Sequence, residues 1–328
     1  MIKRPHFTTV KAYGQTFTSV DYWRPYIEHV CSTERLGIVQ SCVAGLAGTN
    51  PVFIVNDSLV LKFFTDLFGS DSHQVELAFY KDIQPKLQAP TPSLITHGEL
   101  FNPADDKDWH CPYIVTTRTE GMSFGEVKLP TRESQIQAAL FSARVLQAFH
   151  DTTLSTEGVL GALWTEFEKL LSERRNVIRS SIQKLPVPVQ LRTDLLERLE
   201  TITLPYDTTT TPKLLHGDLN RDHILGQICE GGRFDFTGVI DFGDVKVGDP
   251  LYDFVPLHLG LFGADKSLLR IFLDAYNDSA RKSKDFAERA MNYTILYESD
   301  VLTELFEEHE EWRTISNLLD LQDSLWGI

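Results

Sequence analysis

Apolar residues in the first third of the chain recur in short runs that are typical of β-strands. Residues 52 to 64, VFIVNDSLVLKFF, contain two such runs, separated by the turn-forming residues Asn56-Asp57-Ser58. Residues 72 to 88 place most of their apolar side chains on one helical face until Pro85 interferes. PYIVTTR then predicts another strand. The pattern therefore predicts a hairpin, a helix and a strand in a mixed lobe that ends near Arg118.

From Thr131 onward the apolar residues are spaced three and four apart, which is typical of amphipathic helices. We expect helices over about 131–149, 164–184 and 190–202, and a mostly helical region over 267–328. Short apolar runs with acidic residues at their ends lie between them. The sequence therefore predicts an α+β protein with two lobes: residues 1–118, a connection near 113–120, and a mostly helical lobe over 119–328.

Composition limits the classes of partner. The 328 residues are 42% hydrophobic, which is enough for a buried core, and 31 basic against 46 acidic residues give a net charge of −15. This charge argues against nucleic acid or an anionic membrane surface as the main partner and fits a cationic ligand better. The sequence has no run of about 18 apolar residues, no leader-like start and only four scattered cysteines. We expect a cytoplasmic protein, and no pattern indicates an oligomeric state.

The segment His216-Gly217-Asp218-Leu219-Asn220 and the later segment Gly238-Val239-Ile240-Asp241-Phe242-Gly243 carry the most specific chemistry. Asp218 and Asp241 each follow an apolar run, and the two aspartates are 23 residues apart. If the two runs pair as neighbouring strands, the carboxylates converge. Phosphoryl transfer uses such an arrangement, with one carboxylate that accepts a hydroxyl proton and another that holds Mg²⁺ against nucleotide phosphates.

Together with Gly248-Asp249-Pro250-x-x-Asp253, these motifs resemble the aminoglycoside phosphotransferase family, small-molecule relatives of the protein kinases. The resemblance implies a two-lobed, protein-kinase-like fold that transfers the γ-phosphoryl group of ATP or GTP to a hydroxyl. It implies that Asp218 is the catalytic base and that Asp241 binds Mg²⁺. His216 is expected to hold the loop, and Asp249 to support that loop from behind.

The resemblance also directs attention to candidate nucleotide-binding residues in the first lobe. Lys62, on a predicted strand, would neutralise phosphate charge, and Glu76, on the next helix, would hold that lysine in place. Read alone, they could be a solubilising strand lysine and an exposed helix charge. The two-glycine segment 44–50, with Asn50 at its end, could cover the phosphates or be an ordinary turn.

Residues at the connection between the lobes are the remaining nucleotide candidates. Backbone groups around Val115, Thr117 and Arg118 would contact the base, although a plain connecting strand would have the same sequence.

Segments from Tyr22 to Gly327 resemble, in order and spacing, the branch of the family that phosphorylates hygromycin B at its 7″-hydroxyl. The acceptor is therefore expected to be an aminoglycoside or aminocyclitol, with a metabolite such as choline, a sugar or an amino acid as the alternative. Acidic residues of the second lobe are candidates for binding its ammonium groups, or else form a solvated acidic face: Asp244, Glu298, Asp300 and Glu304.

His223 departs from the family pattern, which usually has Asn five residues after the catalytic Asp. Imidazole is a poor ligand for Mg²⁺. Two interpretations remain open: His223 ligates a metal ion, or Asp241 and water hold the ion while His223 positions the loop. His223 is also the one sequence argument for a nucleotide-binding pseudokinase that does not catalyse transfer.

Overall fold

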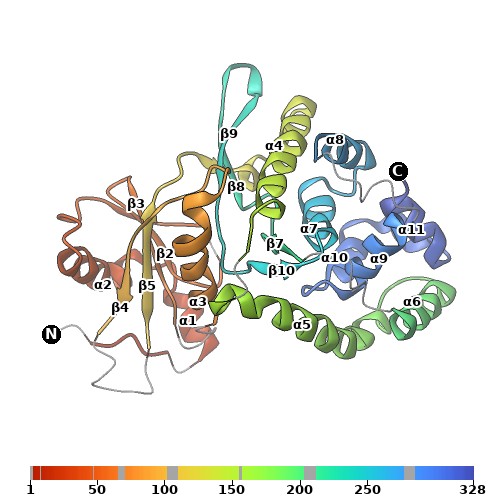
Figure 1. The fold of residues 1–328 in the computed structure, drawn as a ribbon, viewed down its shortest axis with the longest axis horizontal. Coiled ribbons are helices and arrows are strands. Elements are labelled where there is room, and N and C mark those ends of the chain that lie inside the picture. The colour runs from red at the N-terminus through yellow and green to blue at the C-terminus, as the bar shows by residue number, and fades with distance from the viewer. Residues whose placement is uncertain are drawn as a thin grey trace. The chain divides into compact units, whose positions relative to one another are not determined.

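The computed structural model describes residues 3–7, 9–46, 48–65, 71–101, 110–154, 157–202, 212–276 and 285–328 (Figure 1). The chain folds into two compact units. The first is assembled from three segments, Met1–Lys86, Pro90–Glu120 and Gly238–Gly243, and the second from Leu87–Ala89, Gly121–Thr237 and Asp244–Ile328. Each unit is described below by itself.

A five-stranded antiparallel sheet forms the centre of the first unit. Its strand order is β1-β2-β3-β5-β4. The strands are β1 Cys42–Ala44, β2 Val52–Val55, β3 Leu59–Phe63, β4 Leu94–Glu99 and β5 Pro112–Thr117. The helices are α1 Val10–Thr16, α2 Val20–Thr33 and α3 Asp71–Ala78, the last continuing into a π-helical turn, η1 Phe79–Ile83, and a 3₁₀ turn, η2 Gln84–Lys86.

The predicted hairpin over 52–64 is confirmed by β2 and β3. Asn56 and Asp57 in its turn have positive φ values of 51° and 55°, which suits a type I′ turn and the residue types that tolerate it. The Asn56 side chain also accepts hydrogen bonds from the N–H groups of Gln40 and Ser41. The turn is therefore fixed to the segment that leads into β1.

The two faces of this sheet have different surroundings because side chains alternate along a strand. Leu61 and Phe63 of β3 belong to a buried core with Trp23 of α2, whose ring stacks on Phe63 at 4.7 Å between centroids. Lys62, between them, takes the other face. The register pairs Lys62 with Val52 of β2 and Ile114 of β5.

The second unit is mostly helical, which confirms the predicted change of pattern after Thr131. Thr131 caps the first long helix by accepting a hydrogen bond from Ser134 N–H. The helices are α4 Arg132–His150, α5 Gly158–Ile182, α6 Val189–Thr201, α7 Leu251–Pro256, α8 Lys266–Tyr276, α9 Phe286–Leu296, α10 Val301–Glu308 and α11 Leu318–Trp326, with shorter turns η4 Phe124–Glu126, η5 Glu230–Gly232, η6 Leu257–Leu261 and η8 Glu310–Thr314.

Two small sheets accompany these helices. One pairs β7 Lys213–Leu215 with β10 Lys246–Gly248, and the other has the order β6-β8-β9, with β6 Met122–Ser123, β8 Ile224–Ile228 and β9 Phe234–Val239. The runs before Asp218 and Asp241 end in β7 and β9, which belong to different sheets. The two runs therefore do not pair as neighbouring strands, which was the condition for the expected convergence of the two carboxylates.

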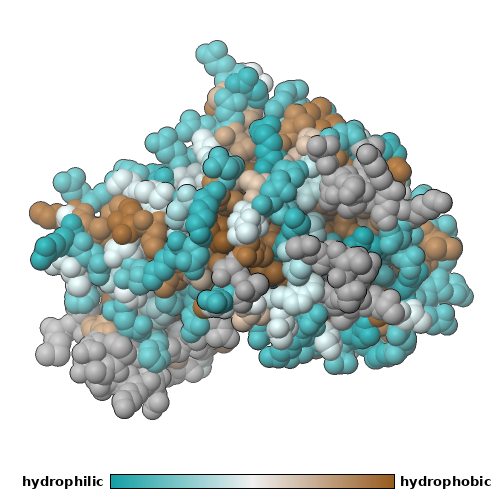
Figure 2. Space-filling model, viewed as in Figure 1, coloured by the Kyte–Doolittle hydropathy of each residue, from teal (hydrophilic) through white to brown (hydrophobic). Residues whose placement is uncertain are grey.

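The α+β, protein-kinase-like fold class expected from the sequence agrees with these elements. No helix within the described ranges combines the length and the hydropathy needed to cross a bilayer. On the face shown in Figure 2, hydrophobic residues form several patches that hydrophilic residues separate from one another.

Candidate functional site

In the first unit, Lys62 lies between two carboxylates. Its Nζ atom is 2.8 Å from Glu76 Oε2 and 2.9 Å from Asp241 Oδ1. Burial of the side chain opposes the positive charge, but the carboxylates of Asp241 and Glu76 outweigh it and raise the pKa of Lys62 above its usual value. The side chain of Glu76 is 4% exposed, whereas that of Asp241 is 36% exposed. Lys62 is therefore held as a cation, and Asp241 is the more accessible of its two partners.

The backbone of Asp241 has a left-handed conformation, with φ 68°, which costs a non-glycine residue energy and persists only where neighbouring contacts hold it. The next residue supplies such a contact. Phe242 is fully buried, stacks on Phe79 at 4.0 Å between ring centroids and meets the ring of Tyr80 in an edge-to-face arrangement. Both partners belong to the π-helical turn η1, so this turn anchors the segment that carries Asp241.

In the second unit, the loop that follows β7 is fixed from its buried side. Asp253 of α7, which is fully buried, accepts hydrogen bonds from the N–H groups of His216 at 2.9 Å and of Gly217 at 2.8 Å. His150 at the end of α4 contacts the same carboxylate through Nε2 at 3.0 Å. A buried carboxylate with three donors is well compensated and holds the loop in one conformation.

The expectation that Asp249 supports this loop is wrong. The carboxylate of Asp249 pairs with Arg289 of α9 and accepts a hydrogen bond from Leu251 N–H at the start of α7. It therefore fixes helices to one another, and Asp253, four residues later, holds the loop.

Asp218 lies beyond this anchored backbone. Its Oδ1 atom accepts a hydrogen bond from Asn220 Nδ2 at 3.1 Å. The Tyr297 hydroxyl donates to the neighbouring Gly217 carbonyl at 2.7 Å. Burial, and to a smaller extent the negative charges of Asp244 and Glu298, raise the pKa of Asp218 to about 6, although His223 and Asn220 oppose the rise. Asp218 therefore has the proton affinity of a base that works near neutral pH.

His223 contacts the same loop. Its Nδ1 atom is 2.7 Å from the backbone carbonyl of Asp218 and 3.7 Å from Asp218 Oδ2. A carbonyl accepts only, so Nδ1 carries the proton in this contact. Nδ1 is therefore engaged with the backbone of the loop, whereas a metal ion would have to bind through Nε2, so the choice between the two interpretations for His223 stays a prediction.

The four acidic candidates for acceptor binding divide into two pairs. Asp244 and Glu298 lie near Asp218, and Lys246 forms an ion pair with Glu298 at 2.9 Å.

Asp300 caps α10 through Thr303 N–H and lies 4.0 Å from Arg174. Glu304, one turn into α10, has a raised pKa because of burial and of neighbouring carboxylates that include Asp300. The first pair is adjacent to the candidate base, and the second is centred on α10.

The remaining nucleotide candidates have mainly internal contacts. Val115 is buried in the core behind the sheet, on the face opposite to Lys62. The N–H groups of Thr117 and Arg118 donate to the carbonyls of Ser93 and Ser58, and the Arg118 side chain contacts Asp57. These backbone donors are therefore engaged within the first unit, and a role in binding the base stays a prediction.

Asn50 lies in the loop before β2, and its side-chain oxygen is buried without a hydrogen-bond partner among the described residues. Ala47, in the middle of the predicted phosphate-covering segment 44–50, lies outside the described residues. The role of this segment stays a prediction.

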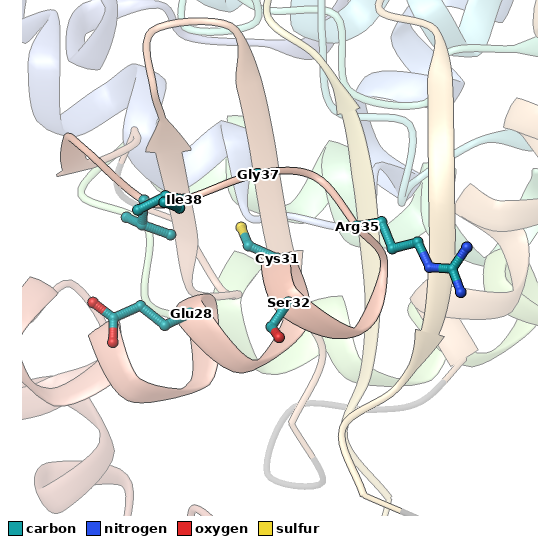
Figure 3. A pocket seen from close by; sticks show the side chains of 7 residues that line it. Glu28, Cys31, Ser32, Arg35, Gly37 and Ile38 are labelled. Carbon is teal, nitrogen blue, oxygen red and sulfur yellow. The ribbon is translucent and has the colours of Figure 1, made fainter.

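A separate cavity of about 540 Å³ lies at the end of α2 and the segment that follows it (Figure 3). Its lining is largely apolar, and the side chain of Arg35 points away from those of Cys31 and Ile38. The lining residues are Glu28, Cys31, Ser32, Arg35, Gly37, Ile38 and Val39. None of them is a candidate site residue, so this cavity has no part in the proposed chemistry.

Sequence reasoning missed three residues of the second-unit site. Asp253 was visible in the Gly-Asp-Pro-x-x-Asp motif but was not distinguished from Asp249. Lys246 and Tyr297 carry no local signal, because each reaches the loop through pairing or packing of distant segments.

Three comparisons with known proteins relate this site to others. A family model described as "Phosphotransferase enzyme family" matches residues 45–290. Among curated proteins, lysine-specific demethylase JMJ21 of Arabidopsis thaliana is 23% identical over 271 residues, which cover 66% of this chain and 29% of that protein. The chain thus corresponds to less than a third of the length of this curated relative.

Solved structures with a similar fold include the GDP complex of wild-type aminoglycoside 2′-phosphotransferase-IIIa, at 21% identity and a TM-score of 0.63, covering 87% of this chain and 97% of that one. The streptomycin–ATP–APH(2″)-IIa ternary complex has 19% identity and a TM-score of 0.57, with 89% and 98% coverage. Aminoglycoside phosphotransferase APH(3″)-Id from Streptomyces rimosus has 18% identity and a TM-score of 0.53, with 84% and 97% coverage. These likenesses establish the fold.

Proposed function

The chain belongs to the phosphotransferase enzyme family, and on this premise we propose that it transfers the γ-phosphoryl group of a nucleoside triphosphate to a hydroxyl of a small amino-bearing molecule. The observation that carries the proposal is the position of Lys62 between Glu76 and Asp241. In kinase-like phosphotransferases, such a lysine neutralises phosphate charge while a carboxylate nearby holds the metal ion.

The lysine suits a nucleotide phosphate. Glu76 is almost fully buried and keeps Lys62 Nζ in place, so that little side-chain entropy is lost when a phosphate binds. The other partner, Asp241, is the accessible one. A bound nucleotide would therefore exchange the Lys62–Asp241 contact for a contact between lysine and phosphate.

Asp241 also suits Mg²⁺. This ion is usually held by one or two carboxylates together with nucleotide phosphates and water, and Asp241 offers a partly exposed carboxylate whose backbone is fixed by Phe242. When bound, the ion would supply charge neutralisation of the phosphates. Because imidazole is a poor ligand for Mg²⁺, we propose that His223 does not bind the ion and instead positions the loop through the Asp218 carbonyl.

Asp218 is proposed as the base. Asp253 fixes the backbone on one side of it, and Asn220 orients its carboxylate. An incoming hydroxyl would donate its proton to this carboxylate as the bond to phosphorus forms. The pKa of about 6 leaves Asp218 ionised at neutral pH and still basic enough to receive the proton.

The proposed acceptor is an aminoglycoside or aminocyclitol, with hygromycin B as the first candidate. The net charge of −15 and the two acidic pairs on the second unit support a cationic acceptor. Several structures with this fold are complexes named for GDP or ATP and for kanamycin or streptomycin. We propose ATP or GTP as the phosphoryl donor and the cytoplasm as the compartment.

A transfer assay tests the proposal. Purified protein is incubated with Mg²⁺ and γ-labelled ATP or GTP, together with hygromycin B, other aminocyclitols, choline or simple sugars, and the label in each acceptor is measured. Label in an aminocyclitol, lost in the Asp218→Asn variant, is the expected result. Label only in choline or a sugar would assign a metabolite kinase, and nucleotide binding without transfer to any acceptor would favour the pseudokinase and contradict the proposal.

A further inference from the structure

Lys246 is an ammonium group placed beside the loop of the candidate base. It begins β10, where the register pairs it with Leu215 at the end of β7, directly before His216-Gly217-Asp218. A Cβ atom added at Gly217 would lie 1.9 Å from the Asp244 carbonyl oxygen and 3.4 Å from Lys246 Nζ. The approach of the Asp244 carbonyl therefore requires a glycine at position 217, which also has the matching φ of 87°, while Lys246 Nζ lies at ordinary contact distance from the loop.

The contacts of Lys246 are those of a bound cation. Its Nζ atom lies 2.9 Å from Glu298 Oε1, donates to the Asp244 carbonyl at 3.0 Å and is 4.0 Å from Asp244 Oδ1. The side chain is 13% exposed, whereas those of Glu298 and Asp244 are 31% and 54% exposed. The lysine is therefore largely covered, and the outer sides of its carboxylate partners are open to solvent.

These carboxylates also belong to the surroundings of Asp218, because both Asp244 and Glu298 interact with it electrostatically. Two carboxylates thus lie near Asp218, and Lys246 forms a close ion pair with Glu298 and lies 4.0 Å from the carboxylate of Asp244. An acceptor ammonium that approached the sides of Asp244 and Glu298 turned toward the loop would have to displace Lys246, a covalently attached competitor whose effective concentration is high.

We propose that Lys246 fills the cation subsite next to Asp218 and so selects acceptors whose reacting hydroxyl is flanked by hydroxyl groups rather than by an ammonium group. This inference rests on the proposed function. It separates two parts of the acidic surface. Lys246 already offsets one of the two negative charges of the Asp244–Glu298 pair, and ammonium groups remote from the reacting hydroxyl are left to the Asp300–Glu304 region of α10.

The first test measures cation binding and does not depend on catalysis. Propylammonium chloride is titrated, at constant ionic strength, into wild type, Lys246→Ala and Lys246→Gln, and binding is followed by the backbone amide shifts of Gly217 and Asp244. Both variants should bind it at least about tenfold more tightly than wild type. Lys246→Ala with Glu298→Gln should lose that gain, and Lys169→Ala, which removes an exposed lysine of α5, should behave like wild type.

Lys246→Gln keeps a donor for the Asp244 carbonyl, so it tests the charge even if Lys246→Ala folds poorly. Equal binding of propylammonium to wild type and to the folded variants, or no binding to any of them, would overturn the proposal.

The second test measures selection. For pairs of acceptors that differ only by an amino or a hydroxyl group on the carbon next to the phosphorylated hydroxyl, the ratio of kcat/KM values should move at least about tenfold toward the amino compound in Lys246→Ala. An unchanged ratio would overturn the selection of acceptors. A further outcome is that propylammonium binds as expected although wild type phosphorylates no acceptor. That result would contradict the proposed function and the selection of acceptors, but it would still support the cation subsite occupied by Lys246.

Discussion

The side chains of Lys62 and Asp241 form an ion pair of 2.9 Å although they are 179 residues apart in the sequence. The lysine therefore joins a strand of the sheet to a short segment that follows β9. Because the same lysine also pairs with Glu76, it can give up one partner and remain neutralised. The Lys62–Asp241 contact is the one that a nucleotide and a metal ion would be expected to replace.

Replacing Lys62 should affect stability and activity differently. Lys62→Met leaves the buried Glu76 carboxylate without its cation, which should lower the free energy of unfolding by about 3 kcal/mol, a typical effect for one half of a buried pair. Adding Glu76→Gln should restore most of this stability but not the activity, which should stay at least about 10²-fold below wild type. Denaturant unfolding and the transfer rate measure the two effects; an active double variant would contradict the phosphate role of Lys62.

Replacing the base should spare the fold. Asp218→Asn keeps the shape of the side chain and its neighbour Asn220, so unfolding and nucleotide binding should match wild type, while turnover falls by at least about 10²-fold. Calorimetry with nucleotide and a steady-state transfer assay provide the comparison. Wild-type turnover in this variant would assign Asp218 a structural role.

The pH profile should report the raised pKa of Asp218. Since only the ionised carboxylate accepts a proton, kcat/KM should be constant above a pH of about 6 and fall tenfold for each pH unit below it. Glu298→Gln removes a negative charge that raises this pKa, so its acid limb should lie at lower pH than that of wild type. As a control, Glu166→Gln on the exposed surface of α5 should leave the limb in place; identical limbs in all three proteins would exclude Asp218 as the titrating group.

Acid should destabilise the docking of the C-terminal helix. Burial lowers the pKa of His258 to about 4, while its Nε2 atom lies 2.9 Å from the Leu325 carbonyl and its ring lies against Trp326. An unfolded histidine has a pKa near 6.5, so the unfolded chain binds the proton first and the folded state loses stability as pH falls from about 6.5 to 4. The loss reaches about 3 kcal/mol below that range.

His258→Gln retains a donor for Leu325 but does not titrate. Between pH 7 and pH 4, wild type should therefore lose about 3 kcal/mol more unfolding free energy than this variant. Denaturant titration at the two pH values measures both losses. Equal losses in the two proteins would show that His258 does not control acid stability.

Local patterns in the sequence were enough for the elements and for part of the site. The hairpin and the long helices follow from spacing and residue type within a few tens of residues, and the structure confirms them. The Lys62–Glu76 pair was expected from the family resemblance, and the structure contains this ion pair. The pairing of β7 with β10 was not predictable in this way, because both strands are three residues long and their partners are chosen by packing. Lys246, Tyr297 and the role of Asp253 depend on that packing and were missed for the same reason.

The three-segment composition of the first unit has a consequence for how the chain is made. Gly238–Gly243, which brings Asp241 to Lys62, is translated long after the five strands of the sheet. During synthesis, Lys62 and Glu76 leave the ribosome without Asp241, and Phe79 and Tyr80 leave it without Phe242. The first unit of a nascent chain that stops before residue 238 therefore exposes an aromatic surface that the complete chain covers, and such chains are the ones we expect chaperones to bind.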